Sequence, residues 1–428
     1  MKWRMRYLTM FVSALLLVTL SFVLWTSNQK KILRIGVYAG SSWDVPNSRE
    51  NRVLDNIIRQ FEKSHPNVKV VYESGIPKKD YDNWLAEKIL KGEQPDVFMV
   101  PENDFSMLAA SGAFKSLDSL ISKEEAAAYY PVAYQAGLYQ GHSYALPIES
   151  NPVMMCVNKD LLEKEGISIP DSNWTLEDLY AICQKVTKDT NGDGLIDQYG
   201  ITDYTWKQAL VAYNGHLRNQ SGVNVDSAEM HQALSFISKL DSLNQRYKVT
   251  SNDFDEGKVA FYPMSLAQYR TYKPYPYHVA KYSRFSWTCI PMPAAKAGIP
   301  ATQVKTSLFA MSSKTKQDKL AWEFMKLLCQ NQKNQQELFA KSQGTSVLTS
   351  VVKSSQTKKI LQADDLGLDS LTSQRLDHMM KHSVLDISRD LDYHSLERLD
   401  YLLGNALKNN EIDSILPSIQ REMEETGK

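Results

Sequence analysis

Apolar runs and helical stripes alternate between Ile32 and Gly112. Residues 32–38 form an apolar run typical of a buried strand, and residues 50–66 repeat apolar positions at helical spacing up to a proline. Two further strand–helix pairs follow at 68–92 and 95–112. Strands that alternate with helices in this order predict a parallel sheet with crossover helices. Solutes bind such sheets beyond the carboxyl ends of the strands, so the loops after the first and third strands are of interest.

The remainder of the chain continues the mixed pattern. A strand followed by a helix is predicted over residues 144–167, and three more strands are predicted at 258–264, 288–293 and 307–312. Amphipathic helices fill the intervening segments, and the last third is rich in helices. We find no internal repeat, and the pattern predicts a two-lobed α/β protein.

The N-terminus carries a different pattern. Residues 8–25 form one uncharged, mostly apolar run, preceded by Lys2, Arg4 and Arg6. This run is just long enough to cross a bilayer, and no small-residue cleavage motif follows it. The positive-inside rule places the basic residues in the cytoplasm and the body outside the cell. We therefore expect an uncleaved transmembrane anchor, with a cleaved signal peptide as the alternative.

Composition narrows the possible partners. The chain has 49 basic and 49 acidic residues, and without the segment 1–31 the balance is 44 to 49, a net charge of −5. Such a body has no electrostatic attraction to nucleic acid. The four cysteines lie far apart, without metal-type spacing: Cys156, Cys183, Cys289 and Cys329. Four buried thiols are the simpler expectation, and a disulfide stays open because the body is expected outside the cell.

Four motifs in order resemble the extracellular solute-binding proteins of ABC importers, the large sugar-binding group typified by maltose-binding protein. They are "LPIESNPVMMCVNKDLLEKEGI", "NWTLEDLYAICQKVT", "FDEGKVAFYPM" and "KLAWEFMKLL". The resemblance covers nearly all of residues 33–428. It implies a two-lobed α/β periplasmic-binding-protein-like fold with strands that cross a hinge, in addition to the N-terminal transmembrane helix.

The resemblance also implies lobe boundaries. One crossing is expected near residues 147–152, a second near 285–291, and a third passage after the helix around Trp322. The first lobe would then comprise residues 33–147 with 288–325. The second lobe would comprise residues 148–287 with 326–428.

A sugar offers apolar faces to aromatic rings and hydroxyls to carboxylates and amides. By resemblance, the ligand-binding candidates are Trp43, Asp44, Glu102, Asn103, Asp104, Glu149, Tyr204, Trp206, Tyr269 and Tyr393. Two alternatives remain open: Asp44 and Asp104 could be helix N-caps, and Tyr204 and Trp206 could pack beneath the helix that follows them. We expect Glu149, at the first crossing, to be the central residue.

The stretch "DTNGDGLIDQYG" has the spacing of a partial calcium loop. Asp189, Asn191, Asp193 and Asp197 occupy the first, third, fifth and ninth positions, but Gly200 stands where a closing glutamate belongs. The loop could hold a structural Ca²⁺, or it could be a solvated turn whose side chains bond its own backbone. No other cofactor is expected.

The expected function is extracellular binding of a mono- or oligosaccharide and its delivery to ABC permease subunits in the membrane, by a monomer. Presentation of the solute to a membrane sensor kinase is the alternative. No nucleophile, metalloprotease or nucleotide-binding motif occurs, so we do not expect an enzyme. A glycosidase, which also needs paired carboxylates, is the less favoured third possibility.

Overall fold

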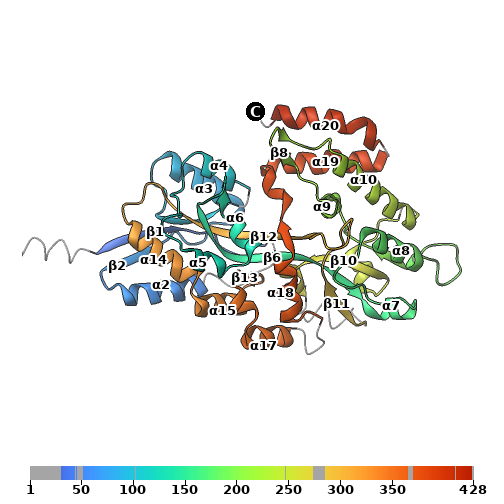
Figure 1. Ribbon diagram of the computed structural model, residues 1–428, viewed down its shortest axis with the longest axis horizontal. Coiled ribbons are helices and arrows are strands. Elements are labelled where there is room, and N and C mark those ends of the chain that lie inside the picture. The colour runs from blue at the N-terminus through green and yellow to red at the C-terminus, as the bar shows by residue number, and fades with distance from the viewer. Residues whose placement is uncertain are drawn as a thin grey trace, which may run out of the picture.

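The computed structural model describes residues 30–43, 45, 52–101, 103–245, 247–272, 285–364, 370–409 and 411–426. Figure 1 shows two bodies side by side, with the strands labelled β6 and β12 in the region between them. No helix within these ranges is long and apolar enough to span a bilayer. The predicted membrane segment at residues 8–25 lies outside them.

The first lobe is built on strands in the order β2-β1-β3-β12-β6. β1 and β2 are parallel, as are β1 and β3, whereas β12 runs antiparallel to β3. The strand bounds are β1 Lys31–Gly36, β2 Val68–Val71, β3 Val97–Val100, β6 Ala145–Asn158 and β12 Thr302–Met311. The parallel sheet predicted between Ile32 and Gly112 is therefore confirmed.

Helices cover this sheet with the apolar stripes that the sequence predicts. In α2, Ile57, Ile58 and Phe61 are buried, and the Phe61 ring meets Phe324 of α14 edge-on at 5.3 Å. The helices around this sheet are α2 Arg52–Ser64, α3 Lys78–Leu90, α4 Phe105–Ala110, α14 Asp318–Cys329 and α15 Gln332–Lys341. A short connection carries α5 Lys123–Ala127, α6 Pro131–Ala136, β4 Leu138–Tyr139 and β5 His142–Ser143.

The second lobe uses the other half of β6. Its sheet pairs β6 with β10 (Val259–Ser265) and β11 (Trp287–Ile290), and β7 (Tyr199–Ile201) joins β10. Successive β6 residues face opposite sides, so Met155 and Val157 enter one core while Met154 and Cys156 enter the other. Both faces of this sheet are therefore covered.

The helices on one face of the second sheet include the C-terminal pair (Figure 1). The elements of this side are α7 Lys159–Lys164, α8 Leu176–Val186, α9 Trp206–Ala212, β8 Arg218–Asn219, β9 Gly222–Val223, α10 Ala228–Asp241, η1 Ser242–Asn244, α19 Tyr393–Asn409 and α20 Ile412–Thr426. The remaining elements lie on the opposite face of this sheet or between the two lobes. They are α11 Ser251–Asp255, α12 Leu266–Tyr272, β13 Thr345–Ser346, α16 Thr349–Val352, α17 Ser355–Asp364, α18 Ser373–Lys381, β14 Ser383–Leu385 and η2 Ile387–Asp390.

Two strands pass between the lobes. The first half of β6 pairs with β12 in the first lobe and its second half with β10 in the second, so the chain crosses near Pro152. β12 makes the second crossing, and β11 pairs with the second half of β6. The lobe boundary predicted at residue 288 stays a prediction; Ile290, Met292, Ala294 and Ala301 belong to the core cluster of the second lobe.

Candidate functional site

The crossing strand β6 brings a carboxylate to the carboxyl edge of the first sheet. Glu149 is only 6% exposed, and its Oε1 accepts a 2.7 Å hydrogen bond from the backbone N–H of Gly344. A Cβ on Gly344 would lie 2.5 Å from that same oxygen. Glycine is therefore required here, because any side chain would displace the Glu149 carboxylate.

Burial raises the pKa of Glu149 above its ordinary value. The side chains of Ser342 and Trp43, the N–H of Gly344 and the positive charge of Arg270 oppose this shift without cancelling it. Because burial outweighs these groups, an additional hydrogen-bond donor at this place would stabilise the charged form of Glu149.

A buried arginine connects this carboxylate to the second lobe. Arg270 of α12 donates from Nη1 to the carbonyl oxygens of Phe339 (2.8 Å) and Gly344 (2.9 Å). Its Nε pairs with Asp364 at 3.1 Å. The peptide groups around Gly344 therefore join Glu149 on one side to Arg270 on the other.

Two polar groups beside Glu149 are buried and have no hydrogen-bond partner in the described part of the chain. They are the indole N–H of Trp43, a residue only 8% exposed, and the hydroxyl of Ser342. Both side chains lower the pKa of Glu149 from close range, yet neither group meets an acceptor in hydrogen-bonding geometry. A buried hydrogen-bond donor without an acceptor lowers the stability of the folded state. The space beside Trp43, Glu149 and Ser342 is therefore suited to bind a hydroxyl-bearing molecule or water.

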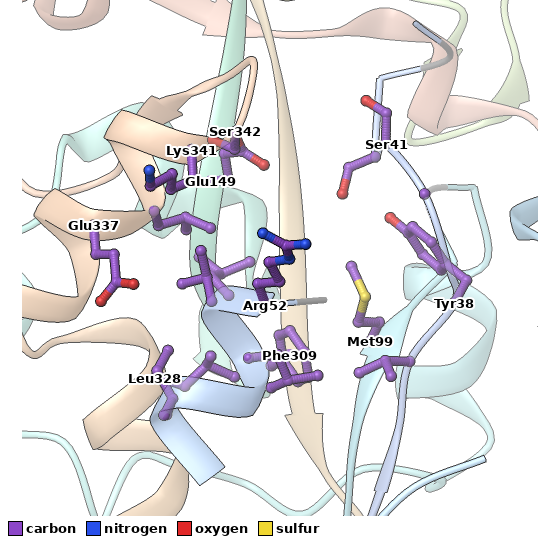
Figure 2. A pocket seen from close by; sticks show the side chains of 18 of the residues that line it. Tyr38, Ser41, Arg52, Met99, Glu149, Phe309, Leu328, Glu337, Lys341 and Ser342 are labelled. Atoms are coloured by element: carbon purple, nitrogen blue, oxygen red, sulfur yellow. The ribbon is translucent and has the colours of Figure 1, made fainter. Parts of the chain in front are cut away.

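A cavity of about 310 Å³ opens beside these residues. Figure 2 shows Tyr38, Ser41 and Met99 on one side of it, and Glu149, Lys341 and Ser342 on the other. Its walls also include apolar side chains, namely Ile57, Ile148, Phe309 and Leu328. An apolar surface with polar groups on its walls is the usual form of a small-molecule site.

The lobes also approach each other at the carboxyl end of β3. Asp104 precedes α4 without capping it, and burial followed by the charge of Asp392 raises its pKa. Asp392 precedes α19 of the second lobe and accepts a hydrogen bond from the N–H of Ser395 at 3.0 Å. Two carboxylates from opposite lobes, Asp104 and Asp392, thus interact electrostatically. We call the region around this pair, where the two lobes meet, the interlobe seam.

An arginine bridges the same seam. Arg389 donates to the carbonyl oxygen of Ala136 at 3.2 Å, and its guanidinium lies 5.7 Å from the ring centroid of Phe105. The helix N-cap alternative for Asp104 is not realised, because its side chain makes no cap hydrogen bond.

The structure places the predicted site residues in three groups. Trp43 and Glu149 lie together, and Glu149 lines the cavity. Asn103 and Asp104 lie at the interlobe seam, near Asp392. Tyr393, the residue after Asp392, is 58% exposed, and its hydroxyl donates to Glu397 at 2.8 Å. Asp44 and Glu102 lie outside the described residues.

The third group comprises three aromatic candidates that lie in cores instead of at the seam. Tyr204 packs edge-on against Phe236, and the indole N–H of Trp206 donates to Asp400 at 2.7 Å. Tyr269 is 1% exposed, with its ring centroid 5.6 Å from that of Trp287. In this conformation these rings have no free face to stack on a sugar, because neighbouring side chains cover them.

Sequence reasoning missed Arg270, Ser342, Gly344 and Asp392. A buried arginine or a glycine after a helix has no distinctive pattern in one sequence. Asp392 had a signal, since it immediately precedes the candidate Tyr393.

The predicted calcium residues serve the loop itself. The Asp189 carboxylate accepts hydrogen bonds from the N–H groups of Asn191, Gly192 and Gly194 (3.1, 2.7 and 2.7 Å), and these bonds lower its pKa. Asn191 Nδ2 donates to Asp193, and Asp197 accepts from Thr190. Within the described ranges, no three acidic, histidine or cysteine side chains are grouped to hold a metal ion. Structural Ca²⁺ binding by this loop stays a prediction.

Comparisons with known proteins agree with this fold. Among solved structures, the chain is similar to the sugar-binding protein MalE from Xanthomonas citri (TM-score 0.74, 16% identity, 92% of this chain and 97% of that one). It is also similar to a cyclic alpha-maltosyl-1,6-maltose binding protein from Arthrobacter globiformis (TM-score 0.71, 14% identity, 92% and 98%). At these identities the similarity establishes the two-lobed α/β fold.

Curated relatives match over shorter stretches. A maltotriose-binding protein from Pyrococcus abyssi is 26% identical over 138 residues, which are 32% of this chain and 30% of that protein. A putative binding protein from Brucella abortus is 24% identical over 292 residues, which are 65% and 68% of the two chains. The chain thus spans about a third of the length of the first curated relatives it matches.

One family model covers most of the chain. It describes the bacterial extracellular solute-binding proteins, and it matches residues 56–364. The predictions of a solute-binding protein, of a body outside the cytoplasm and of a protein that is not an enzyme are confirmed by this match. The chain belongs to the bacterial extracellular solute-binding proteins.

Proposed function

We propose that the protein binds a carbohydrate between its two lobes and delivers it to the permease of an ABC importer. The observation that carries this proposal is the group of polar side chains at Glu149: the buried carboxylate and the unpaired hydroxyl of Ser342 line a cavity, and the unpaired indole N–H of Trp43 lies next to Glu149. Sugar hydroxyls both donate and accept hydrogen bonds, so a single sugar could satisfy all three groups.

The interlobe seam supplies the second half of the site. Asp104 and Asp392 repel each other when both are charged, and this repulsion favours separated lobes. A solute whose hydroxyls donate to both carboxylates would offset the repulsion and favour the closed form. Tyr393 offers an exposed ring next to this pair, suited to pack against the apolar face of a sugar ring.

Similar proteins support a carbohydrate as the solute. Those named above bind maltotriose, a cyclic maltosyl-maltose or other sugars according to their names. An importer role also agrees with the family to which the chain belongs. We propose further that residues 8–25 anchor the protein, with the lobes on the outer face of the membrane. Intact-mass analysis of the protein recovered from membranes would distinguish this anchor from a cleaved signal peptide.

The proposal is tested with a panel of neutral mono- and oligosaccharides, with amino acids and a dipeptide as other solute classes. Thermal unfolding of the whole chain is followed with each compound, and hits are titrated by calorimetry. At a hundredfold excess over Kd, a true ligand adds about 2.7 kcal/mol to the stability of the folded state. Stabilisation by an amino acid or dipeptide and by no saccharide would contradict the proposal.

A pair of tyrosine variants places the sugar at the seam. Tyr393→Ala should weaken saccharide binding about tenfold, equivalent to about 1.4 kcal/mol, because an exposed stacking surface is lost. Tyr401→Ala is the matched control, since Tyr401 is also an exposed tyrosine of α19 and lies against Arg398. Equal affinities of both variants and the wild type would remove Tyr393 from the site.

A further inference from the structure

Two of the four cysteines lie directly opposite each other on neighbouring strands. Cys156 of β6 is the register partner of Cys289 of β11, and their Sγ atoms are 3.6 Å apart. Both residues are fully buried. They are brought together from positions that are 133 residues apart in the sequence.

The backbone pattern around this pair suits a covalent link. The N–H of Cys289 donates to the carbonyl oxygen of Ser370 at 2.8 Å, so it points away from β6. Because the N–H and C=O of a strand residue point to the same side, Cys156 and Cys289 form a non-hydrogen-bonded pair. In such pairs the Cα atoms are about 4.5 Å apart, within the roughly 4.4–6.8 Å that disulfides span.

The other two cysteines have no such neighbour. Cys183 of α8 belongs to the core on one face of the second sheet, and Cys329 ends α14 in the core of the first lobe. Their thiols are therefore enclosed in different lobes. Any intramolecular disulfide that leaves this fold intact must join Cys156 to Cys289.

We propose that Cys156 and Cys289 form a disulfide in the exported protein and join the hinge-crossing strand to β11. The family places the body outside the cytoplasm, where disulfides form and persist. The two thiols would transfer two electrons and two protons to the disulfide of a thiol–disulfide oxidoreductase, which leaves as a dithiol. Since both sulfurs are shielded in the folded chain, the bond forms during folding and afterwards resists reductants in solution.

The bond would have a mechanical consequence. It closes a loop that contains α7 to α12, most of the helices on the second lobe, and a long closed loop restricts the unfolded chain strongly. The half of β6 that belongs to the second lobe would thereby stay fixed to its sheet while the lobes move about the crossing strands.

The test counts thiols in the full chain after export by its host. Protein is denatured without reductant, alkylated with N-ethylmaleimide and weighed intact, and a second sample is reduced first. We expect two modified cysteines without reduction and four after it, with peptide mapping that links residues 156 and 289. Four modified cysteines without reduction, or a link that involves Cys183 or Cys329, would overturn the proposal.

Cysteine variants make the count specific to the proposed pair. Cys156→Ser should expose three modifiable thiols without reduction, and Cys183→Ser should expose one. The midpoint of urea unfolding should fall when dithiothreitol is added to the wild type and to Cys183→Ser, and it should not change for Cys156→Ser. Equal midpoints of the wild type with and without reductant would also contradict the bond.

Discussion

Replacement of Gly344 by alanine tests the structural centre of the candidate site. Gly344 donates its N–H to Glu149 at 2.7 Å and accepts from Arg270 at 2.9 Å. A Cβ at this position would lie 2.5 Å from Glu149 Oε1 and 2.7 Å from both Cδ and Cγ. These distances are too short for the carboxylate to stay in place.

The cost has two physical sources. Overpacking of a buried site costs about 1–3 kcal/mol. A buried carboxylate that loses its backbone donor costs about 1–3 kcal/mol more. We therefore expect Gly344→Ala to lower the free energy of unfolding by about 2–6 kcal/mol and to weaken saccharide binding. Urea unfolding followed by tryptophan fluorescence, with the slope unchanged, measures the first effect.

Gly404→Ala is the matched control with the opposite sign. Gly404 lies within α19, and a Cβ there meets no atom within 4 Å. Alanine should stabilise this exposed helical position by about 0.5–1 kcal/mol. The double variant Glu149→Ala with Gly344→Ala should be less destabilised than the sum of the single variants, because the clash is removed. A Gly344→Ala protein with wild-type stability and affinity would refute the described contact.

Three further predictions concern other parts of the molecule. Asp104→Asn should raise the free energy of unfolding by about 0.5 kcal/mol at neutral pH, after allowance for solvent screening. Because the pKa of Asp104 is raised in the folded state, this gain in stability should disappear as the pH falls through that pKa towards 3.8. Urea titrations at several pH values measure the effect. Trp206→Phe removes the donor to Asp400 and should cost about 1–2 kcal/mol of stability without any change in saccharide affinity, so a large loss of affinity in calorimetry would return Trp206 to the binding site. Arg270→Met leaves Asp364 and two carbonyl oxygens without their donor and should cost about 3–5 kcal/mol in urea unfolding, whereas near-wild-type stability would show that the buried arginine contributes little.

The fold was predictable because its strongest signals are local. The apolar stripe at Ile57, Ile58 and Phe61 predicts α2, and the apolar run at 32–38 predicts β1. The exact crossing was less accessible, since only the pairing of β11 and β12 with β6 decides which lobe each one joins. Pairing between distant segments is not encoded by periodicity.

The candidate site was predictable only in part. Glu149 was identified by the family resemblance, which implies a carboxylate at the first crossing, and the structure buries it beside the N–H of Gly344. Tyr204, Trp206 and Tyr269 could not be distinguished from site residues, because an aromatic side chain at the edge of a helix serves a core equally well. Arg270 and Gly344 acquire their roles from contacts that only the folded chain creates.

The central claim is that two lobes close on a sugar held between them, and small-angle X-ray scattering of the whole chain in detergent tests it most directly. Scattering is recorded with and without a saturating saccharide identified from the panel, with Tyr393→Ala at the same sugar concentration as the control. We predict that the radius of gyration of the wild type falls when the saccharide binds, and that the variant needs about ten times more sugar for the same change. Identical scattering curves with and without every saccharide that binds would contradict the account.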